Sequence, residues 1–132
     1  MDQLLQIEVP ADVANLRLIR LVTLDAGERA GLDCDSVDDL RIGVEELCVP
    51  VLSAAANTDA DNNLSLRYRV SAAFVVVHGI ARLGPNAVEL GLSRVASSIL
   101  SVVVDHFEMI NGGSVVRFGL AKRRVPAFSV ST

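Results

Sequence analysis

The stretch VDDLRIGVEELCVPVLSAA, residues 37–55, carries the clearest helical pattern of the chain. Apolar residues on one face recur at helical spacing, which predicts a buried amphipathic helix: Leu40, Val44, Leu47 and Val51. The same stretch holds adjacent carboxylates at Glu45 and Glu46, and Pro50 follows four residues after the second. Because proline in a helix interior is about 3 kcal/mol less favourable than alanine, Pro50 requires an explanation.

The composition predicts one folded domain over residues 1–122, followed by a C-terminal tail at 123–132. Of the 132 residues, 51% are hydrophobic and 21% are charged, which supports a core and excludes a disordered chain. The net charge of −4 does not favour binding to nucleic acid or to an anionic membrane. We interpret the short basic cluster Lys122-Arg123-Arg124 as a solvated strand end.

Targeting and cysteine patterns predict a cytoplasmic protein. No apolar run reaches the roughly 18–20 residues that span a bilayer, and MDQLLQIEVP lacks the features of a signal peptide. The two cysteines match no zinc or CxxC spacing. Cys48 is expected in the core, and Cys34 is expected in a loop.

The first half of the chain predicts a strand at 4–9 and then two helices. The first helix is capped by Asp12 and ends near residue 30, and the residues predicted on its buried face are Ala14, Leu18, Leu21 and Val22. The second helix is predicted to begin at Ser36, with Asp39 completing a capping box.

The second half predicts two hairpins around a third helix. Strands at 64–71 and 73–83 turn near Ser71-Ala72, and strands at 105–110 and 114–122 flank Asn111-Gly112-Gly113. The third helix is expected to begin near Val88, with apolar residues at helical spacing: Leu92, Val95, Ala96, Ile99, Val102 and Val103. The order β-α-α-β-β-α-β-β predicts an α+β two-layer sandwich, with three helices on one face of a mixed sheet of about five strands.

This order and the helix at 37–55 resemble the histidine-kinase-like (GHKL) ATP-binding fold, in the small version found in bacterial anti-sigma-factor serine kinases. The resemblance covers about residues 10–122. It places Glu46 on the general-base glutamate of that family and Pro50 on its magnesium-binding asparagine. Magnesium prefers oxygen ligands, and proline has no side-chain oxygen. Proline also removes the backbone hydrogen bond to the Glu46 carbonyl, so we expect no metal at this helix.

Two further stretches of the family's ATP site are altered under the same resemblance. The aspartate–glycine box that binds adenine is matched to His78 and Gly79. The glycine-rich helix start that cradles phosphates is matched to Glu89 and Gly91, and a carboxylate there repels phosphate. Together with Pro50, these positions predict a retained fold with a degenerate ATP site and no bound cofactor.

The resemblance, together with the three altered stretches of the ATP site, implies a regulatory protein of the anti-sigma-factor type that acts by protein–protein interaction without ATP hydrolysis or kinase activity. Its implied partners are a sigma factor or an anti-sigma-factor antagonist, and the first helix is a possible homodimer surface. A first alternative is a divergent ATP-dependent serine protein kinase, with Glu46 as base and Glu45 or backbone carbonyls holding Mg²⁺.

A second alternative is a small-ligand or catalytic pocket unrelated to ATP. The titratable groups available to it are Glu45, Glu46, His78, Glu89 and His106. Adjacent helix positions point about 100° apart, so Glu45 and Glu46 are not expected to form a catalytic dyad.

Overall fold

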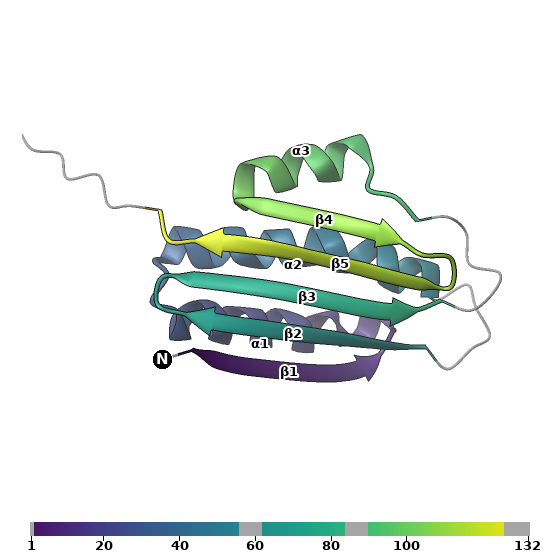
Figure 1. Cartoon of the computed structure of the whole chain (residues 1–132), viewed down its shortest axis with the longest axis horizontal. Helices are drawn as coiled ribbons and strands as arrows, with labels where there is room; N and C mark the ends of the chain where they lie inside the picture. The colour runs from purple at the N-terminus through teal and green to yellow at the C-terminus, as the bar shows by residue number, and fades with distance from the viewer. Residues whose placement is uncertain (1, 56–61, 84–89, 126–132) are drawn as a thin grey trace, which may run out of the picture.

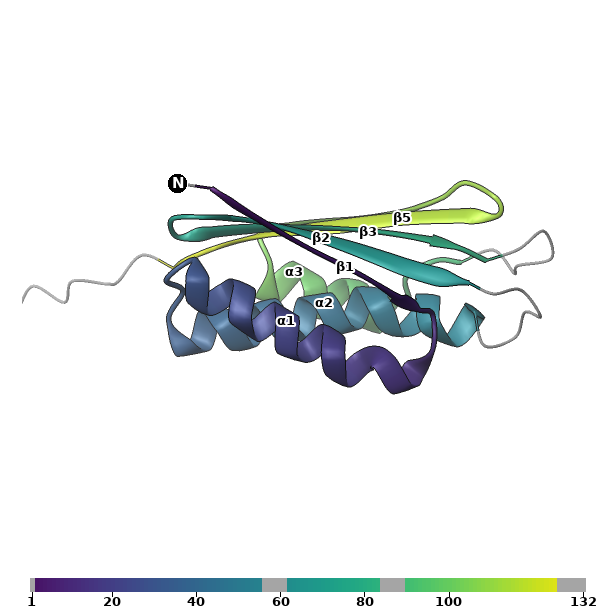
Figure 2. The same ribbon diagram turned by 90° about the horizontal axis from the view of Figure 1, so that it is seen from below.

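The computed structural model describes residues 2–55, 62–83 and 90–125 and forms two layers. Three helices lie on one side of a five-stranded sheet, and the other side of the sheet is uncovered (Figures 1 and 2). The elements in chain order are β1 (Gln3–Pro10), a 3-10 turn (Val13–Asn15), α1 (Leu16–Arg29), α2 (Cys34–Ala55), β2 (Asn63–Ser71), β3 (Phe74–Arg82), α3 (Arg94–Val103), β4 (His106–Asn111) and β5 (Val115–Arg123). The predicted α+β two-layer sandwich is confirmed.

The sheet is antiparallel throughout, so the prediction of a mixed sheet was wrong. Its strand order is β1-β2-β3-β5-β4, and every neighbouring pair runs antiparallel. The crossover through α3 makes β3 and β4 parallel to each other, as the sequence order suggests. However, β5 returns through a hairpin and inserts between them, which separates the two parallel strands (Figure 1).

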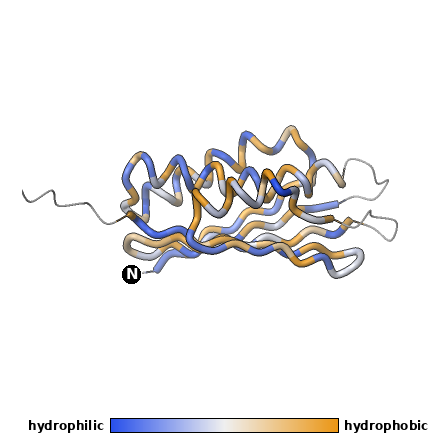
Figure 3. The backbone as a smooth tube through the Cα atoms, turned by 90° about the horizontal axis from the view of Figure 1, so that it is seen from above, coloured by the Kyte–Doolittle hydropathy of each residue, from blue (hydrophilic) through white to orange (hydrophobic). Residues whose placement is uncertain are grey.

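Both predicted hairpins are present. The β2–β3 turn places Ala73 at a φ of 62°, and the β4–β5 turn places Gly113 at a φ of 84°. The Gly113 N–H also donates to Asn111 Oδ1 at 3.2 Å, which stabilises the second turn. Buried and more exposed positions alternate along β2 and β3, because only one face of the sheet is covered. Figure 3 shows hydrophobic and hydrophilic residues alternating along parts of the strands.

The core lies between α2 and the sheet. All four residues of the predicted stripe on α2 are buried: Leu40, Val44, Leu47 and Val51. Gly43 lets the helix pack closely against the end of α3 and against β5, since a Cβ at this position would lie 2.6 Å from Val104 Cγ1 and 3.1 Å from Leu120 Cδ2. Cys48 is also buried, as expected. Among the described helices, none combines the length and apolar character needed to cross a bilayer.

The buried face of α1 differs from the predicted one. Leu18 and Leu21 are 44% and 56% exposed, and Ala14 precedes the helix in the 3-10 turn that Asp12 caps. The residues that are actually buried are Ile19, Thr23, Ala26 and Gly27. Thr23 Oγ1 lies 2.8 Å from the hydroxyl of Tyr68 on β2, and it also donates to the carbonyl of Ile19. This buried contact, together with the packing of Ile19, sets which face of α1 meets the sheet.

The helix starts of α2 and α3 also differ from the predicted ones. Helix α2 begins at Cys34 rather than at Ser36, because Asp33 Oδ1 accepts the Ser36 N–H at 2.9 Å. Cys34 is therefore an exposed helical residue and not a loop thiol. Helix α3 begins at Arg94, and residues 90–93 are not helical; the predicted start at Val88 lies outside the described residues.

Two groups of side chains have a different environment from the one predicted. Lys122 is only 5% exposed, and its Nζ lies 3.5 Å from Asp39 Oδ2, so it is not part of a solvated strand end. Lys122 is at one of the positions of β5 whose side chains face the helices. Asp39 pairs with Lys122 there and does not complete a capping box. On α3, Val95 and Val102 are exposed, whereas Ala96, Leu100 and Val103 form the buried face.

Candidate functional site

A cavity of about 340 Å³ lies beside the second half of α2, at the start of α3. Helix α2 contributes Glu45, Glu46, Val49 and Pro50 to its lining. The segment that leads into α3 contributes Gly91 and Ser93, and the first turn of α3 contributes Ala96. Three of the sequence-predicted site residues, Glu46, Pro50 and Gly91, are thus brought to one cavity.

Pro50 lies inside α2, which continues to Ala55. Its ring nitrogen has no proton, so the carbonyl of Glu46 lacks the helical donor that any other residue at position 50 would supply. The helix therefore presents a proline ring and a backbone carbonyl without its helical partner near the cavity. At this position no side-chain oxygen is available to a cation.

The two adjacent carboxylates have different environments. Glu45 is held by Arg20 of α1 and by Arg41, whose Nη1 lies 3.3 Å from Glu45 Oε2. Its side chain is 19% exposed. Glu46 is partly buried and forms no hydrogen bond or ion pair within the described residues. Glu45 therefore links α1 to α2 through its ion pair with Arg20. Glu46 is the carboxylate that remains free to contact a molecule in the cavity.

The start of α3 forms the opposite wall. Ser93 is the N-cap residue, and its Oγ accepts the N–H of Ala96 at 3.0 Å. A Cβ at Gly91 would meet nothing within 4 Å, so packing does not require glycine there. Glu89, the other residue predicted at this wall, lies outside the described residues.

His78 and Gly79 do not line this cavity, in contrast to their predicted place in the ATP site. Both lie within β3, and the exposed side chain of His78 points away from the helices. The imidazole lies over Gly119 of β5, where an added Cβ would come within 2.8 Å of His78 Cδ2. Gly79 faces the helices beneath the ring of Phe118, so close packing accounts for this glycine.

The remaining titratable groups do not converge on the cavity. His106 is exposed at the start of β4, and the preceding Asp105 accepts the backbone N–H of Arg123 at 2.7 Å. Burial raises the pKa of the Cys48 thiol to about 12, and the charge of Glu45 adds to this effect. Within the described parts of the chain, no three His, Cys, Asp or Glu side chains gather as metal ligands do.

Sequence reasoning missed Val49, Ser93 and Ala96 as residues that line the cavity. A signal for Ser93 was present, because serine directly before an apolar helical run is a typical N-cap. Val49 lies three residues after Glu46, on the same side of α2. Its position was less informative, because an aliphatic residue on a helix is usually assigned to the core.

The family model of the histidine kinase-like ATPase domain matches residues 9–95. The chain belongs to the histidine kinase-like ATPase domain family. The match covers the whole of α2 and the segment that leads into α3. It therefore includes every residue that lines the cavity except Ala96, and the family resemblance predicted from the sequence is confirmed.

Two curated relatives share part of the chain. It is 30% identical over 66 residues to the serine-protein kinase RsbW of Bacillus subtilis, and 27% identical over 66 residues to that of Bacillus velezensis. Each alignment covers 50% of this chain and 41% of the relative, so less than half of either relative is matched.

A solved structure has the same fold. The crystal structure of the RsbU and RsbW domains of Rv1364c from Mycobacterium tuberculosis superposes with a TM-score of 0.72, over 92% of this chain and 32% of that one. The sequence identity is 15%, so this likeness shows the arrangement of helices and strands.

Proposed function

We propose that this protein is an anti-sigma-factor-like regulator that acts by binding other proteins and does not transfer phosphate. Its partners are a sigma factor or an anti-sigma-factor antagonist protein. The observation that carries the proposal is Pro50, which lies inside α2 one turn after Glu46 and lines the same cavity. By the family resemblance, this is the position of the magnesium-binding asparagine.

The chemistry of Mg²⁺ explains why this position matters. The ion requires near-octahedral oxygen ligands, and in nucleotide sites the protein usually supplies one or two of them. A proline at position 50 supplies none from its side chain. Without the ion, the phosphates of a nucleotide would face Glu46 with their charge uncompensated, and nearby like charges repel by several kcal/mol.

The partner class is supported by the relatives. Two of them are named serine-protein kinase RsbW, and the solved structure contains an RsbW domain beside an RsbU domain. The cytoplasmic location expected from the sequence agrees with partners of this kind. Binding to a purified sigma factor or to an antagonist from the same genome, measured by calorimetry, tests the partner class; binding to neither would contradict it.

A titration with a fluorescent ATP analogue and Mg²⁺ tests the nucleotide part of the proposal. For the unmodified protein we expect a dissociation constant above about 1 mM, a binding free energy weaker than about 4 kcal/mol. Micromolar binding would contradict the proposal. The informative pair of variants is Pro50→Asn, which adds an oxygen donor, and Pro50→Ala, which restores the helix without one. Only Pro50→Asn is expected to tighten Mg²⁺-dependent binding.

A divergent serine kinase is the second candidate, and one observation favours it. Glu46 lines the cavity and has no partner within the described residues, so its carboxylate is free to accept a proton from a substrate hydroxyl that enters the cavity. The carbonyl of Glu46, which lacks its helical donor, adds a possible oxygen ligand. Transfer of labelled phosphate from ATP to a serine of the antagonist protein, lost in Glu46→Gln, would establish this activity in place of the first proposal.

A further inference from the structure

The uncovered face of the sheet is strongly basic, although the whole chain has a net charge of −4. Five of the twelve Lys and Arg residues occupy strand positions that face away from the helices: Arg67, Arg69, Arg82, Arg117 and Arg123. The carboxylates on the strands of this face are Glu8 of β1 and Glu108 of β4. The basic sheet face, as we call this surface, is therefore opposite in charge to the chain as a whole.

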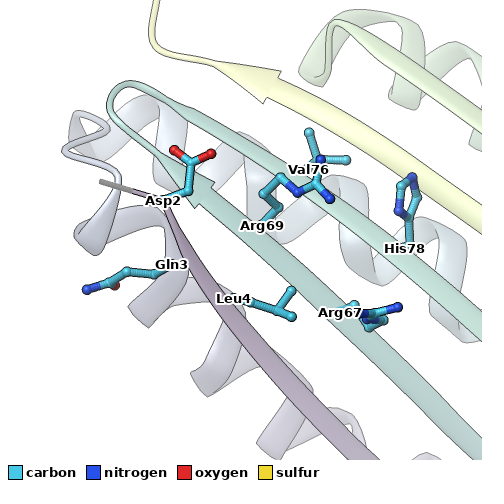
Figure 4. Close-up of a pocket in the computed structure, with 7 residues that line it drawn as sticks. All are labelled: Asp2, Gln3, Leu4, Arg67, Arg69, Val76 and His78. Atoms are coloured by element: carbon cyan, nitrogen blue, oxygen red, sulfur yellow. The ribbon is translucent and has the colours of Figure 1, made fainter.

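Two adjoining hollows form one groove across the basic sheet face. The first, of about 290 Å³, lies between the start of β1 and Arg67, Arg69 and His78 (Figure 4). The second, of about 300 Å³, extends from Arg67 and His78 toward Arg117. Because they share Arg67 and His78, the groove continues from β1 to β4.

The cations along this groove have no ionic partner within the described residues. No ion pair or side-chain hydrogen bond joins Arg67, Arg69 or Arg117 to a carboxylate there. By contrast, Arg20, Arg29 and Arg41 on the helices all pair with carboxylates. The strand arginines thus retain their capacity to bind an external anion.

The floor of the groove is apolar between these charges. Leu4, Ile80 and Ile110 are 55%, 36% and 56% exposed. Gly119 contributes no side chain, so the ring of His78 lies flat against the sheet and the groove stays open. A ligand here meets arginines interspersed with aliphatic side chains, and one carboxylate in each hollow, Asp2 in the first and Glu108 in the second.

We propose that the basic sheet face binds an extended, acidic segment of a partner protein, with aliphatic residues between its carboxylates. Neighbouring strands lie about 4.8 Å apart, so a path across all five strands is about 19 Å long, the length of five or six extended residues. This surface lies on the opposite side of the sheet from α2 and the cavity beside it. The inference therefore goes beyond the proposed function and does not depend on whether nucleotide binds.

A second copy of this chain is a poorer occupant. Two basic sheet faces repel each other, which excludes a symmetric pair through this surface. On the helix side, Asp25, Asp38 and Glu45 already pair with arginines of α1 and α2, which removes part of the acidic charge there. A contact between this side of one copy and the basic sheet face of another would be head-to-tail, and such contacts give rings or open filaments rather than closed dimers.

Nucleic acid also fits less well than an acidic peptide. Single strands bind by stacking their bases on aromatic rings. Among the described residues of this face, Phe74 is the only Phe, Tyr or Trp, and the guanidinium of Arg123 already lies 5.7 Å from the centre of its ring. The imidazole of His78 lies against Gly119. The exposed aliphatic residues suit a polypeptide instead.

The test uses a fluorescein-labelled peptide of about ten residues in which Glu and Asp alternate with Leu and Ile. Fluorescence polarisation at about 0.15 M salt is expected to show micromolar binding, and the same peptide with Lys in place of the acids is expected not to bind. In amide NMR spectra of the labelled full chain, shifts are expected on β2, β3 and β5 but not on α1. This mapping requires no variant.

The variant pair is Arg67→Glu with Arg117→Glu, and, as a control of equal charge change, Arg17→Glu with Arg94→Glu. Arg17 and Arg94 are exposed on the helix side and form no ion pair within the described residues. We expect at least a tenfold loss of peptide binding in the first variant and less than a twofold change in the control. Equal losses in both, absence of peptide binding, shifts confined to the helices, or tighter binding of a (dT)12 oligonucleotide would each overturn the proposal.

Discussion

Gly79 and Gly119 sit on neighbouring strands, and each leaves room for a ring from its pairing partner. Gly79 is paired with Phe118, whose ring occupies the space of the missing side chain on the helix side. Gly119 is paired with His78, whose ring does the same on the open side. The two glycines thus let bulky residues lie flat on both faces of the sheet centre.

Replacing Gly79 with alanine is expected to destabilise the fold by about 1–3 kcal/mol, through overpacking. The added Cβ would lie 2.2 Å from Phe118 Cζ, and Phe118 is only 3% exposed, so the ring has little room to move. Urea unfolding of Gly79→Ala, of Phe118→Leu and of the double variant measures the effect on the free energy of unfolding. If the double variant is not more stable than the sum of the two single changes predicts, the clash is not the cause.

The buried thiol of Cys48 predicts a loss of stability in alkaline solution. Burial raises its pKa from an ordinary value of 9.0 to about 12, so above pH 9 the unfolded chain releases a proton that the folded protein keeps. The contribution of the protonated Cys48 thiol to the free energy of unfolding is complete below about pH 9. It is lost as the pH rises toward 12, and the free energy of unfolding then falls by up to about 1.4 kcal/mol per pH unit.

Urea unfolding between pH 8 and pH 10 measures this slope. Cys48→Ala is expected to show a smaller decline than the unmodified protein, although its stability at pH 8 is lower because of the cavity. Cys34→Ala, which removes an exposed thiol, is the matched control and is expected to keep the full decline. An unchanged slope in Cys48→Ala would contradict this assignment.

Single residues in the sheet centre show where sequence reasoning reached its limit. His78 and Gly79 were matched to an adenine-binding motif only by their position in the sequence. A nearly continuous apolar strand does not reveal which of its faces a helix will cover. Only the pairing with Phe118 and Gly119, about 40 residues later in the chain, decides where each of the two residues points.

At the level of the element, α2 combines a well-predicted buried face with an unfavourable residue. Replacing Pro50 with alanine is expected to stabilise the protein by about 1–3 kcal/mol, because it restores the hydrogen bond to the Glu46 carbonyl and removes the steric conflict of the ring. Thermal unfolding measures the change. A loss of stability would mean that the packing of α2 depends on the proline ring.

Helix α1 shows why a helix can be predicted while its orientation is not. Aliphatic residues occur around most of its circumference, so several faces match a buried stripe. The choice is made by Thr23, a polar residue that pattern reasoning assigns to the surface but that binds the buried hydroxyl of Tyr68. On α2, by contrast, the predicted stripe of Leu40, Val44, Leu47 and Val51 is buried, although Val49 lies outside it and is exposed.

At the level of the whole molecule, the ion pair between Lys122 and Asp39 joins the sheet to the helical layer. Lys122 of β5 is 5% exposed and meets Asp39 of α2 at 3.5 Å. Asp39→Ala is expected to destabilise the protein by about 1–3 kcal/mol, because it leaves a buried ammonium without its partner. Asp39→Ala combined with Lys122→Met, measured by urea unfolding, is expected to recover most of that loss; no recovery would show that the charge is not the cause.

The overall architecture was predictable because the elements alternate in a pattern that few folds share. The five strands, three helices and both hairpins follow from local turn residues and periodicity. The pairing of β5 with β3 was not predictable, because local turn chemistry specifies only the β4–β5 hairpin. That one long-range pairing makes the sheet antiparallel and sets the residues that face one another on its uncovered side.

The position of β5 also has a consequence for how the molecule is made. This strand is synthesised last among the elements, yet it joins β3 on one side and β4 on the other. Before residues 115–123 leave the ribosome, the nascent chain therefore has β1, β2 and β3 on one side and β4 on the other, with no strand between β3 and β4. Until then, the edge of β3 stays open to other chains, as unpaired strands do. Completion of the fold is tied to the end of translation of this region.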